Sequence, residues 1–338
     1  MTTRAPLVVV KRGNIIESIH LGHVVAIDSS NKTVATFGNP GFHTYVRSAI
    51  KPLQAIAVLE SGAADRYSLN EQELVAICSS HNGEEMHSSL VRSILAKLGI
   101  SEDYLRCGSH APLHKGTLEE MSSRGEIPST LHNNCSGKHA GMIASAMVLG
   151  VPLDTYLDPN HPVQLLILSI ISDLCGTPID KIDIGIDGCG APVFGMPLHR
   201  LALGFVRLVT GAGVPEPRRE YCMKLVKAIA SYPYILAGTD RFDSLLMEVT
   251  DGRLTVKSGA EGIVAIGDNV RGLGIVVRVE DGSERALFPA AVEALMQIGL
   301  INQKQRDALD HFHHPIIRNW AGTTVGSLQP VFTLNQYK

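Results

Sequence analysis

Short runs of β-branched and apolar residues fill the first forty positions of the chain, at residues 7–10, 15–19, 23–28 and 33–38. Segments rich in glycine, asparagine, serine and proline stand at 11–14, 28–32 and 38–41. Short apolar runs bounded by such residues are typical of strands joined by turns. This part of the chain therefore predicts an antiparallel meander, followed by a helix that begins near residue 48.

From about residue 70 to 230, the apolar residues recur at helical spacing instead. Asn70 or Ser68 can cap the first of the predicted helices. These helices cover residues 71–78, 86–98, 139–149, 162–174, 197–210 and 215–231. Strands return at 254–257, 263–266 and 274–279, and a helix follows at 289–298. The tail has no clear periodicity, and we expect its histidines (His311, His313 and His314) to be solvated or locally packed rather than bound to a metal.

The simplest arrangement of these elements pairs both groups of strands in one sheet. It predicts an α/β (α+β) fold, with an antiparallel sheet flanked by helices and an inserted, mainly helical lobe. We expect residues 1–338 to form a single domain of two lobes with a cleft between them. The α/β lobe would comprise residues 1–65 and 240–338, and the helical lobe residues 66–239.

Composition places the chain among ordinary globular proteins, with 45% hydrophobic and 19% charged residues. A formal net charge of −3 gives no reason to expect nucleic acid or an anionic membrane surface as a partner. No apolar run has the length of a membrane span. The run at 7–10 is too short for an export signal and ends at Lys11 and Arg12. We therefore expect a cytoplasmic protein whose six cysteines are reduced.

A serine and a lysine, Ser48 and Lys51, stand three residues apart at the start of a predicted helix. Residues at this spacing lie on one helix face about one turn apart, so the amine can approach the hydroxyl. A serine attacks as a nucleophile only with a base beside it. A lysine acts as that base when burial or a nearby cation disfavours its charged form, and Arg47 could supply the cation.

Two further segments carry groups that could act with this pair. Ser80 and Asn82 stand in the loop after the helix 71–78. The hydroxyl could pass a proton to a leaving amine and the amide could orient a carbonyl, although an ordinary helix stop explains the same residues. Lys257, Ser258 and Gly259 end a predicted strand, where they offer a cation, a hydroxyl and close approach to the backbone, or simply a glycine turn.

Cys135 and Cys189 lie in polar, glycine-flanked loops, which is an unusual setting for a structural thiol. Lys138 stands close to Cys135 in sequence and would favour thiolate. Two thiolates and a nitrogen donor suit Zn²⁺. Because no C-x-x-C spacing is present, a redox pair, a covalent nucleophile and plain polar loops remain open alternatives.

The motifs S-x-x-K, S-x-N and K-[ST]-G occur in this order along the chain. Together they form the motif set of serine β-lactamases and penicillin-binding proteins. The order of secondary structure agrees, because the first motif opens a helix after the meander and the third ends a strand of the returning sheet. The chain thus resembles these proteins, and the resemblance implies a serine β-lactamase-like fold.

Longer blocks at residues 47–52, 80–84, 133–142 and 187–190 resemble the rhizobial-type L-asparaginase II family. The resemblance extends from the first strands to about residue 300. It implies hydrolysis of L-asparagine to L-aspartate and ammonia through an acyl-enzyme. Ser48 would attack with Lys51 as base, and Ser80 paired with Lys257 would pass the proton to ammonia. The backbone N–H groups of Ser48 and Ala260 would form the oxyanion hole.

The same resemblance implies a zinc ion near the site, held by Cys135, Lys138 and Cys189, with a water. A lysine ligand must be neutral, which is unusual. We expect the ion to hold the α-amino or α-carboxylate end of the substrate rather than to generate the nucleophile. The residues expected around the substrate, each of which could equally be structural, are Arg47, Asn82, His139 and Asp187.

Several alternatives remain at the level of the sequence. A glutaminase would keep every catalytic residue, because one methylene is worth only about 1–3 kcal/mol in a pocket. A zinc amidohydrolase, in which the metal generates hydroxide, and a non-catalytic zinc-binding protein are also possible. No separate glutamate stands out to activate a deacylating water, so β-lactam hydrolysis is not expected. Ser48 is favoured over Ser80 as the nucleophile, and a homodimer is expected.

Overall fold

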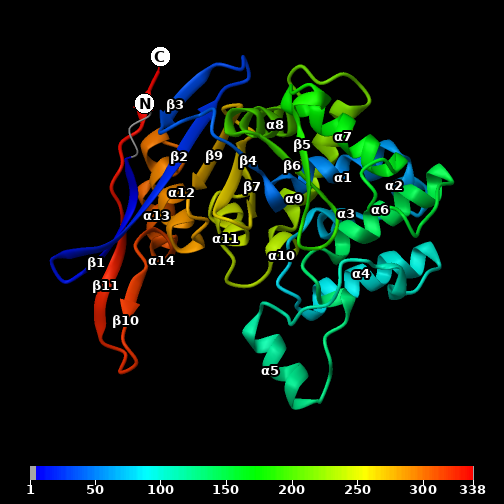
Figure 1. Ribbon diagram of the computed structural model, residues 1–338, viewed down its shortest axis with the longest axis horizontal. Helices are drawn as coiled ribbons and strands as arrows, with labels where there is room; N and C mark the ends of the chain where they lie inside the picture. Colours follow the sequence, from blue (N-terminus) through cyan, green and yellow to red (C-terminus); the bar gives the residue numbers. More distant parts are fainter. Residues whose placement is uncertain (1–4, 338) are drawn as a thin grey trace.

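The computed structural model describes residues 5–337 and contains one large antiparallel sheet beside a group of helices (Figure 1). Nine strands form this sheet: β1 (Pro6–Arg12), β2 (Ile15–Ile27), β3 (Thr33–Phe37), β7 (Leu254–Gly259), β8 (Ile263–Asp268), β9 (Leu273–Val279), β10 (Ile316–Arg318), β11 (Thr324–Pro330) and β12 (Asn335–Gln336). The strand order is β10-β11-β1-β2-β9-β8-β7, and β3 pairs with both β2 and β12.

The two groups of strands meet where β2 pairs with β9, for example Val24 with Val277. This pairing confirms that both groups belong to one sheet. The segments 15–19 and 23–28 are not separate strands, however, because β2 runs through them without a break. Its first half pairs with β1 and its second half with β9 and β3, so the chain changes partner without turning.

Most of the predicted helices are confirmed, with ends shifted by a few residues. The helices of the structure are α1 (Lys51–Glu60), α2 (Ala63–Arg66), α3 (Glu71–Cys78), α4 (Glu85–Leu98), α5 (Lys115–Ser123), α6 (Ser136–Leu149), α7 (Pro162–Cys175), α8 (Leu198–Thr210), α9 (Arg218–Ser231), α10 (Pro233–Ala237), α11 (Phe242–Val249), α12 (Glu284–Ile298), α13 (Gln303–Ala308) and α14 (Asp310–His313). The start of α12 lies five residues before the predicted start at Pro289, because Ala286 and Leu287 are already buried.

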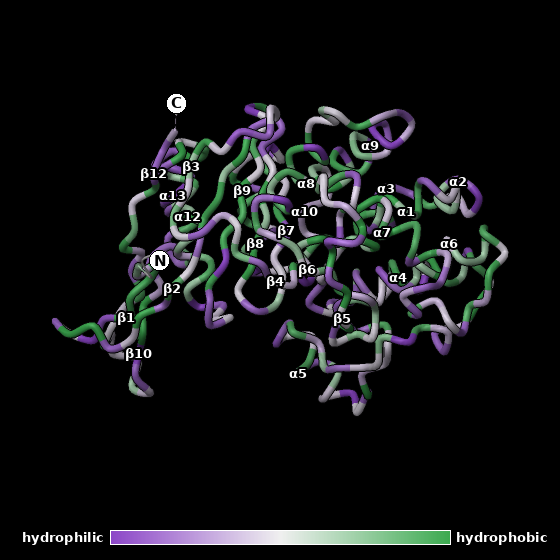
Figure 2. Tube along the Cα trace, turned by 45° about the horizontal axis from the view of Figure 1, so that its top comes forward, coloured by the Kyte–Doolittle hydropathy of each residue, from purple (hydrophilic) through white to green (hydrophobic). Residues whose placement is uncertain are grey.

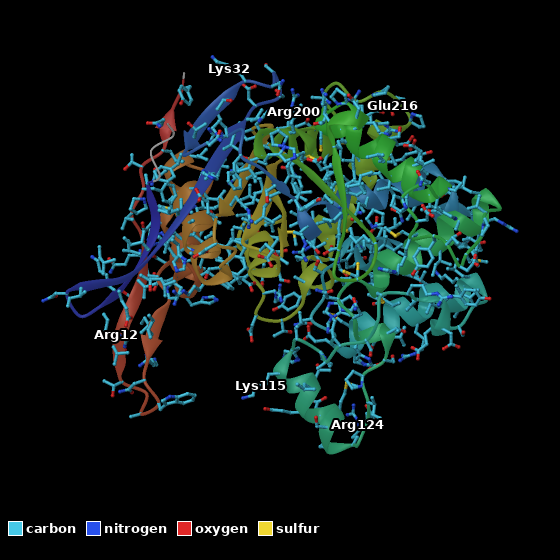
Figure 3. All side chains as sticks on the ribbon, in the orientation of Figure 1. Arg12, Lys32, Lys115, Arg124, Arg200 and Glu216 are labelled. Carbon is cyan, nitrogen blue, oxygen red and sulfur yellow. The ribbon has the colours of Figure 1, made fainter. Side chains whose placement is uncertain are left out.

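The core is continuous from the sheet into the helical region. Helices α8 and α12 pack on the strands, and α7 packs between α8 and α1. Hydrophobic stretches follow the central strands and the inner helices, whereas polar stretches follow the outer loops (Figure 2). Charged side chains such as Arg12, Lys115 and Arg124 lie at the periphery (Figure 3). Helix α8 lies on the sheet, whereas the prediction places it in the helical lobe. The division into two lobes therefore stays a prediction.

A second, three-stranded sheet has no counterpart in the prediction. It has the order β4-β6-β5 and comprises β4 (His43–Tyr45), β5 (Asp183–Ile186) and β6 (Pro192–Pro197). Strand β4 leads directly to Arg47, and the loop between β5 and β6 contains Asp187 and Cys189. This small sheet therefore brings two segments about 140 residues apart in sequence to the same place.

The tail is more ordered than the sequence predicts, because β10 and β11 extend the large sheet beyond β1. His313 is buried, and its Nε2 lies 2.8 Å from Glu293 Oε2, in keeping with the locally packed tail that we expect. Within residues 5–337, no helix is both long and apolar enough to cross a membrane.

Candidate active site

Ser48 lies in a single 3₁₀ turn, η1 (Arg47–Ile50), and Lys51 is the first residue of α1. The predicted position of the pair at a helix start is thus correct, although the serine itself is in the tighter turn. Arg47, just before the serine, has a φ of +48°, a conformation that costs energy for a residue with a side chain. The backbone is held there by the small sheet, since Val46 N–H donates to Phe194 O over 2.9 Å.

The Lys51 side chain is buried, and its nitrogen contacts three oxygen atoms. They are Ser79 O at 2.6 Å, Ser80 Oγ at 3.0 Å and Asn134 O at 3.1 Å. An ammonium would donate to all three. A neutral amine would donate to the two carbonyls and direct its lone pair at Ser80 Oγ, so both forms satisfy these contacts. No hydrogen bond joins Lys51 to Ser48 within the described residues, and the hydroxyl that bonds to this amine is that of Ser80.

Ser80 and Asn82 lie in the loop after α3, as the motif predicts. This helix starts with a capping box between Asn70 and Glu73, which fixes where it begins and hence where the loop lies. Ser80 N–H and Asn82 N–H then donate to Leu236 O and Ala237 O, each at 3.0 Å.

The Asn82 side chain is buried against the next segment of the chain. Its Nδ2 donates to Thr239 O over 3.3 Å, and a Cβ on Gly238, which has a φ of +112°, would lie 2.3 Å from Asn82 Oδ1. Only glycine fits there. Asn82 therefore braces the loop that carries Ser80, and it does not line the pocket described below.

Lys257 is fully buried on β7, and its nitrogen lies 2.7 Å from Ser258 O and 3.5 Å from Asp243 Oδ2. Burial lowers the pKa of Lys257 to about 8, although the Asp243 carboxylate opposes the shift. The predicted pairing of Ser80 with Lys257 is not present as a hydrogen bond in the described structure, because Ser80 Oγ bonds to Lys51 instead.

Asp243, in the first turn of α11, anchors the end of β7. Its Oδ2 accepts hydrogen bonds from Ser258 N–H at 2.9 Å and from Ser258 Oγ at 3.0 Å. The carboxylate is thus a counter-ion for Lys257 and a fixed point for the K-S-G segment. Sequence analysis missed it, because an aspartate in the first turn of a helix is common for reasons unconnected with a site.

These elements surround a pocket of about 280 Å³. Ser48 and Ser80 both lie on its wall, and the other lining residues are Leu113, Asn134, Arg241, Ser258, Gly259, Ala260, Glu261, Gly262, Gly282 and Glu284. A Cβ on Gly259 would lie 2.9 Å from Ala49 N and 3.1 Å from Ser48 N. The end of β7 therefore lies directly against the turn that carries the serine. Both Ser48 and Ala260 line the pocket, as an oxyanion hole built from their N–H groups requires.

Cys135, Lys138 and Cys189 come together beside the pocket, all three buried. Lys138 Nζ lies 3.2 Å from Cys189 Sγ. A hydrogen bond between the two thiols lowers the pKa of Cys135 well below its usual value and raises that of Cys189. Although burial disfavours the charge on Lys138, Cys135 and Cys189 raise its pKa. The three groups are thus close together, but none of them lines the pocket.

The other residues expected around the substrate already have protein partners. Arg47 forms an ion pair with Asp187, with its Nε at 3.0 Å and a terminal nitrogen at 2.8 Å from Oδ1. Burial alone would raise the pKa of Asp187, but Lys138, Gly188 N–H and Arg47 together lower it. His139 Nδ1 lies 2.6 Å from the Tyr156 hydroxyl, which also accepts from Arg106 N–H. None of these side chains lines the pocket.

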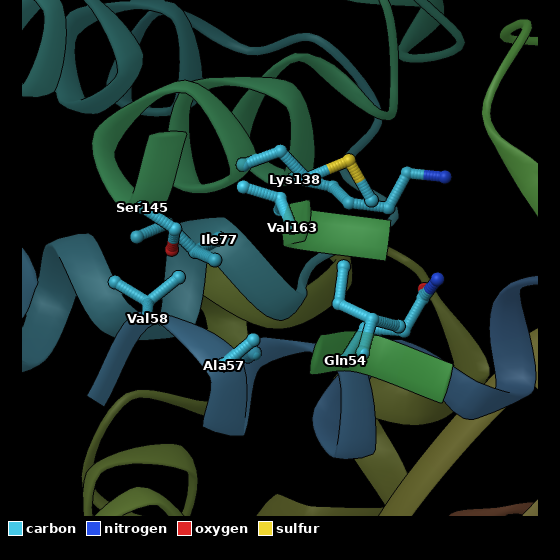
Figure 4. Close-up of a pocket in the computed structure, with 10 residues that line it drawn as sticks. Gln54, Ala57, Val58, Ile77, Lys138, Ser145 and Val163 are labelled. Atoms are coloured by element: carbon cyan, nitrogen blue, oxygen red, sulfur yellow. The ribbon is translucent and has the colours of Figure 1, made fainter. Parts of the chain in front are cut away.

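A second cavity lies among α1, α3, α6 and α7 and measures only about 10 Å³ (Figure 4). Gln54, Val58, Ile77 and Lys138 are among its lining residues, and the amine of Lys138 points away from its apolar end. This volume is enough for about one water molecule and too small for a substrate. Two larger hollows, lined by Arg92 and by Thr33 among others, contain no residue of the three motifs. The pocket beside Ser48 and Ser80 is the candidate site because residues of all three motifs line it.

A family model described as L-asparaginase II matches residues 8–330, which is nearly the whole chain. The chain belongs to the L-asparaginase II family. The predicted family is therefore confirmed, and with it the predicted class of enzyme, a hydrolase that acts on asparagine. The four sequence blocks that carry the resemblance all lie within the matched range.

Several solved structures are similar to this L-asparaginase II family chain in overall shape. A β-lactamase from Mycobacterium bovis has a TM-score of 0.45 and 16% identity, with 83% of this chain and 95% of that chain covered. A class C β-lactamase from Rhodobacter sphaeroides has a TM-score of 0.43, 13% identity and the same coverage. A structure described as Mglu has a TM-score of 0.38 and 12% identity, covering 82% of this chain and 67% of that chain. No curated protein sequence matches the chain.

The predicted fold class is confirmed by the structure itself. The antiparallel sheet, the flanking helices and the helical segment between the two groups of strands are all present. The three motifs of the sequence also meet in space, since residues of each of them (Ser48, Ser80 and Ser258) line one pocket.

Proposed function

We propose that this enzyme hydrolyses L-asparagine to L-aspartate and ammonia through an acyl-enzyme on Ser48. One observation carries the proposal: two serines and the end of β7 line one pocket, with a buried lysine 3.0 Å from one of the hydroxyls. A binding module has no use for a buried amine beside a pocket hydroxyl, whereas a serine hydrolase needs a base there. Family membership supports the choice of substrate.

In the first step, Ser48 Oγ would attack the carbon of the side-chain amide. Its proton would pass to Lys51 by way of Ser80, whose hydroxyl bonds to the amine. The N–H groups of Ser48 and Ala260 would stabilise the negative oxygen of the tetrahedral intermediate. The C–N bond would then break, and the leaving nitrogen would take up the proton and depart as ammonia. The acyl group would stay on Ser48 Oγ as an ester.

In the second step, a water would attack the ester. The Ser80 hydroxyl and the Lys51 amine would accept a proton from that water and return one to Ser48 Oγ. L-aspartate would then be released. Lys257 would keep a positive charge close to Ser80 and the developing oxyanion. Its carboxylate partner, Asp243, favours that charge against the effect of burial and holds the amine at a fixed position.

The first test is ammonia release from the purified protein with L-asparagine, L-glutamine and a chromogenic β-lactam. We expect turnover of L-asparagine and loss of about 10³-fold or more in Ser48→Ala. Mass spectrometry of rapidly quenched protein would identify the acylated serine, with Ser80→Ala as the matched variant. Acylation of Ser80 instead would exchange the roles of the two serines, and no turnover of any substrate would contradict the proposal.

We also propose a zinc ion held by Cys135, Lys138 and Cys189. The donor set fits in kind and position, because two thiols and an amine lie together and are buried. The amine, whose pKa the two cysteines raise, would have to lose its proton to bind the ion. Among the described residues no three histidine, cysteine, aspartate or glutamate side chains come together as a metal site, so the nitrogen ligand would be the lysine. When bound, zinc would supply a fixed positive charge at this point and join the loop of Cys135 to that of Cys189.

Metal analysis tests this proposal independently of activity. We expect about one zinc ion per chain, retained in Cys222→Ala, which removes a buried thiol elsewhere, and lost in Cys135→Ala and Cys189→Ala. The melting temperature should fall when the zinc ion is lost. A disulfide between Cys135 and Cys189 in the protein as purified would favour the redox alternative. The cytoplasmic location and the homodimer stay predictions.

A further inference from the structure

Arg241 differs from the other cations around the pocket because it has no partner. Lys51 bonds to three oxygen atoms, Lys257 lies beside Asp243, and Arg47 pairs with Asp187. Lys138 lies against Cys189. Arg241 lines the same pocket as Ser48 and Ser80, yet its side chain forms no hydrogen bond or ion pair with another described residue.

The backbone fixes the position of Arg241. Asp240 before it has a φ of +58°, and Arg241 itself is the N-cap of α11. Two residues later, Asp243 is tied to Ser258 by two hydrogen bonds, so the start of α11 is held against the end of β7. The backbone of Arg241 is therefore held at the pocket wall, and its partly exposed side chain extends from a fixed point rather than from a free loop tip.

We propose that Arg241 binds the α-carboxylate of the substrate, and that the pocket selects amides whose carbon chain carries a carboxylate. A guanidinium pairs with a carboxylate through two parallel hydrogen bonds, which fixes the orientation as well as the charge of the ligand. Glu261, whose Oε1 lies 3.8 Å from a terminal nitrogen of Arg47, and Glu284 line the same pocket and supply negative charge for the α-ammonium of an amino acid. The lining thus fits a zwitterion, with the side-chain amide left to face the serines.

This inference rests on the proposed function, and it assigns the carboxylate to a residue that the sequence did not single out. The sequence-based expectation places the α-groups at the zinc ion instead. That alternative requires one of the three metal-binding groups to face the substrate, whereas none of them lines the pocket. Arg241, by contrast, does.

The test compares two substrates that share the reacting amide. L-asparagine carries the α-carboxylate, and L-aspartic diamide has it replaced by a neutral amide. In Arg241→Gln we expect KM for L-asparagine to rise about 10- to 100-fold with kcat changed only a few-fold, and Arg241→Lys to lose less. We expect the diamide to be a poor substrate of the unmodified enzyme, and Arg241→Gln should not change its rate further. The matched control is Arg92→Gln, an exposed arginine on α4 that should behave as the unmodified enzyme.

Equal losses for both substrates, or an unchanged KM for L-asparagine, would overturn the inference. So would a KM that rises on removal of zinc but not in Arg241→Gln, because the carboxylate would then lie at the metal. Melting curves of each variant separate a binding defect from misfolding.

Binding measurements keep this test separate from that of the proposed function. If the unmodified enzyme releases no ammonia, the proposed reaction fails, and calorimetry with L-asparagine on Ser48→Ala still tests Arg241. Binding that weakens at least tenfold in the Ser48→Ala/Arg241→Gln double variant supports the inference. Equal binding to both proteins, or no binding to either, contradicts it.

Discussion

Two buried lysines lie beside the same pocket, and the protein holds them in different ways. On what we call the helix side (Ser48, Lys51, Ser79, Ser80 and Asn134), the amine of Lys51 is surrounded by two carbonyl oxygens and a hydroxyl. On the strand side (Asp243, Lys257, Ser258, Gly259 and Ala260), the amine of Lys257 lies beside a carboxylate. The helix side thus fixes the position of its amine mainly through neutral oxygen atoms, with the Cys135 thiol also nearby, whereas the strand side supplies a carboxylate.

The difference separates two tasks of a serine–lysine site. A base must exchange protons with a hydroxyl, which requires an exact position relative to that hydroxyl. An electrostatic partner must keep its charge, which requires a nearby carboxylate. Substitutions on the helix side should therefore remove the reaction, whereas those on the strand side should weaken it or change its pH dependence.

The largest effect is expected for Lys51→Met, which removes the amine but keeps much of the buried volume. Ammonia release from L-asparagine should fall about 10³-fold or more, because Lys51 is the amine that bonds to the Ser80 hydroxyl in the described part of the chain. Lys51→Arg should be nearly as inactive, since a guanidinium does not give up its proton. Activity within tenfold of the unmodified enzyme in either folded variant would mean that the base lies on the strand side.

Gly259→Ala should have the next largest effect, because it disturbs the contact between the two sides. The new Cβ would lie 2.9 Å from Ala49 N and 3.1 Å from Ser48 N, so one of the two backbones must move. We expect kcat to fall about 10²-fold, as for the loss of an oxyanion-hole donor, with a small change in KM. Gly41→Ala is the control, since its Cβ would contact only the Asn39 side chain at 3.3 Å. Full activity of Gly259→Ala would mean that the reaction does not depend on the close contact between Gly259 and the backbone of Ser48 and Ala49.

Asp243→Asn should lower the rate about tenfold and shift its pH dependence. Burial lowers the pKa of Lys257 to about 8, and the Asp243 carboxylate raises it. Loss of the carboxylate therefore lowers the pKa further. If the charged form of Lys257 supports the reaction, the rate of the unmodified enzyme falls above about pH 8, and that fall moves to lower pH in Asp243→Asn. A pH–rate profile that stays in place, or moves to higher pH, would remove Lys257 from the reaction.

The smallest effect is expected for Ser258→Ala. This change removes the 3.0 Å hydrogen bond from the hydroxyl to Asp243 but keeps the 2.9 Å bond from the backbone N–H. The carboxylate stays in place, so kcat should fall no more than about threefold. A loss as large as that of Asp243→Asn would show that the hydroxyl itself contacts the substrate.

The motif residues could be predicted from sequence because their chemistry is tied to local spacing. Ser48 and Lys51 occupy a helix start, and Ser80 follows a helix whose cap, Asn70, is visible in the sequence. Arg241, Asp243 and Asn134 have no such signal. Their importance comes from contacts with segments that are distant in sequence, and neither apolar periodicity nor a spacing rule contains those contacts.

The same limit explains the errors in the fold. The three strands of the small sheet are short, and two of them contain glycine or proline. Strand β11 also contains glycine and proline, which are unfavourable in strands. Pairing with partners elsewhere in the chain stabilises these segments, so local propensity does not predict them. The long helices are predicted well, because each one shows its buried face in its own sequence.

The pairing of β2 with β9 has a consequence for biosynthesis. Its paired residues, such as Gly22 and Val279, are roughly 250 positions apart, so β2 leaves the ribosome long before its partner exists. At a synthesis rate of about 5–20 residues per second, this delay is on the order of 10–50 s. During that time one edge of a strongly apolar strand has no neighbour and is open to aggregation. The pocket is completed only when β7 has been made, so a nascent or truncated chain that ends before residue 254 holds Ser48, Lys51 and Ser80 but no finished site.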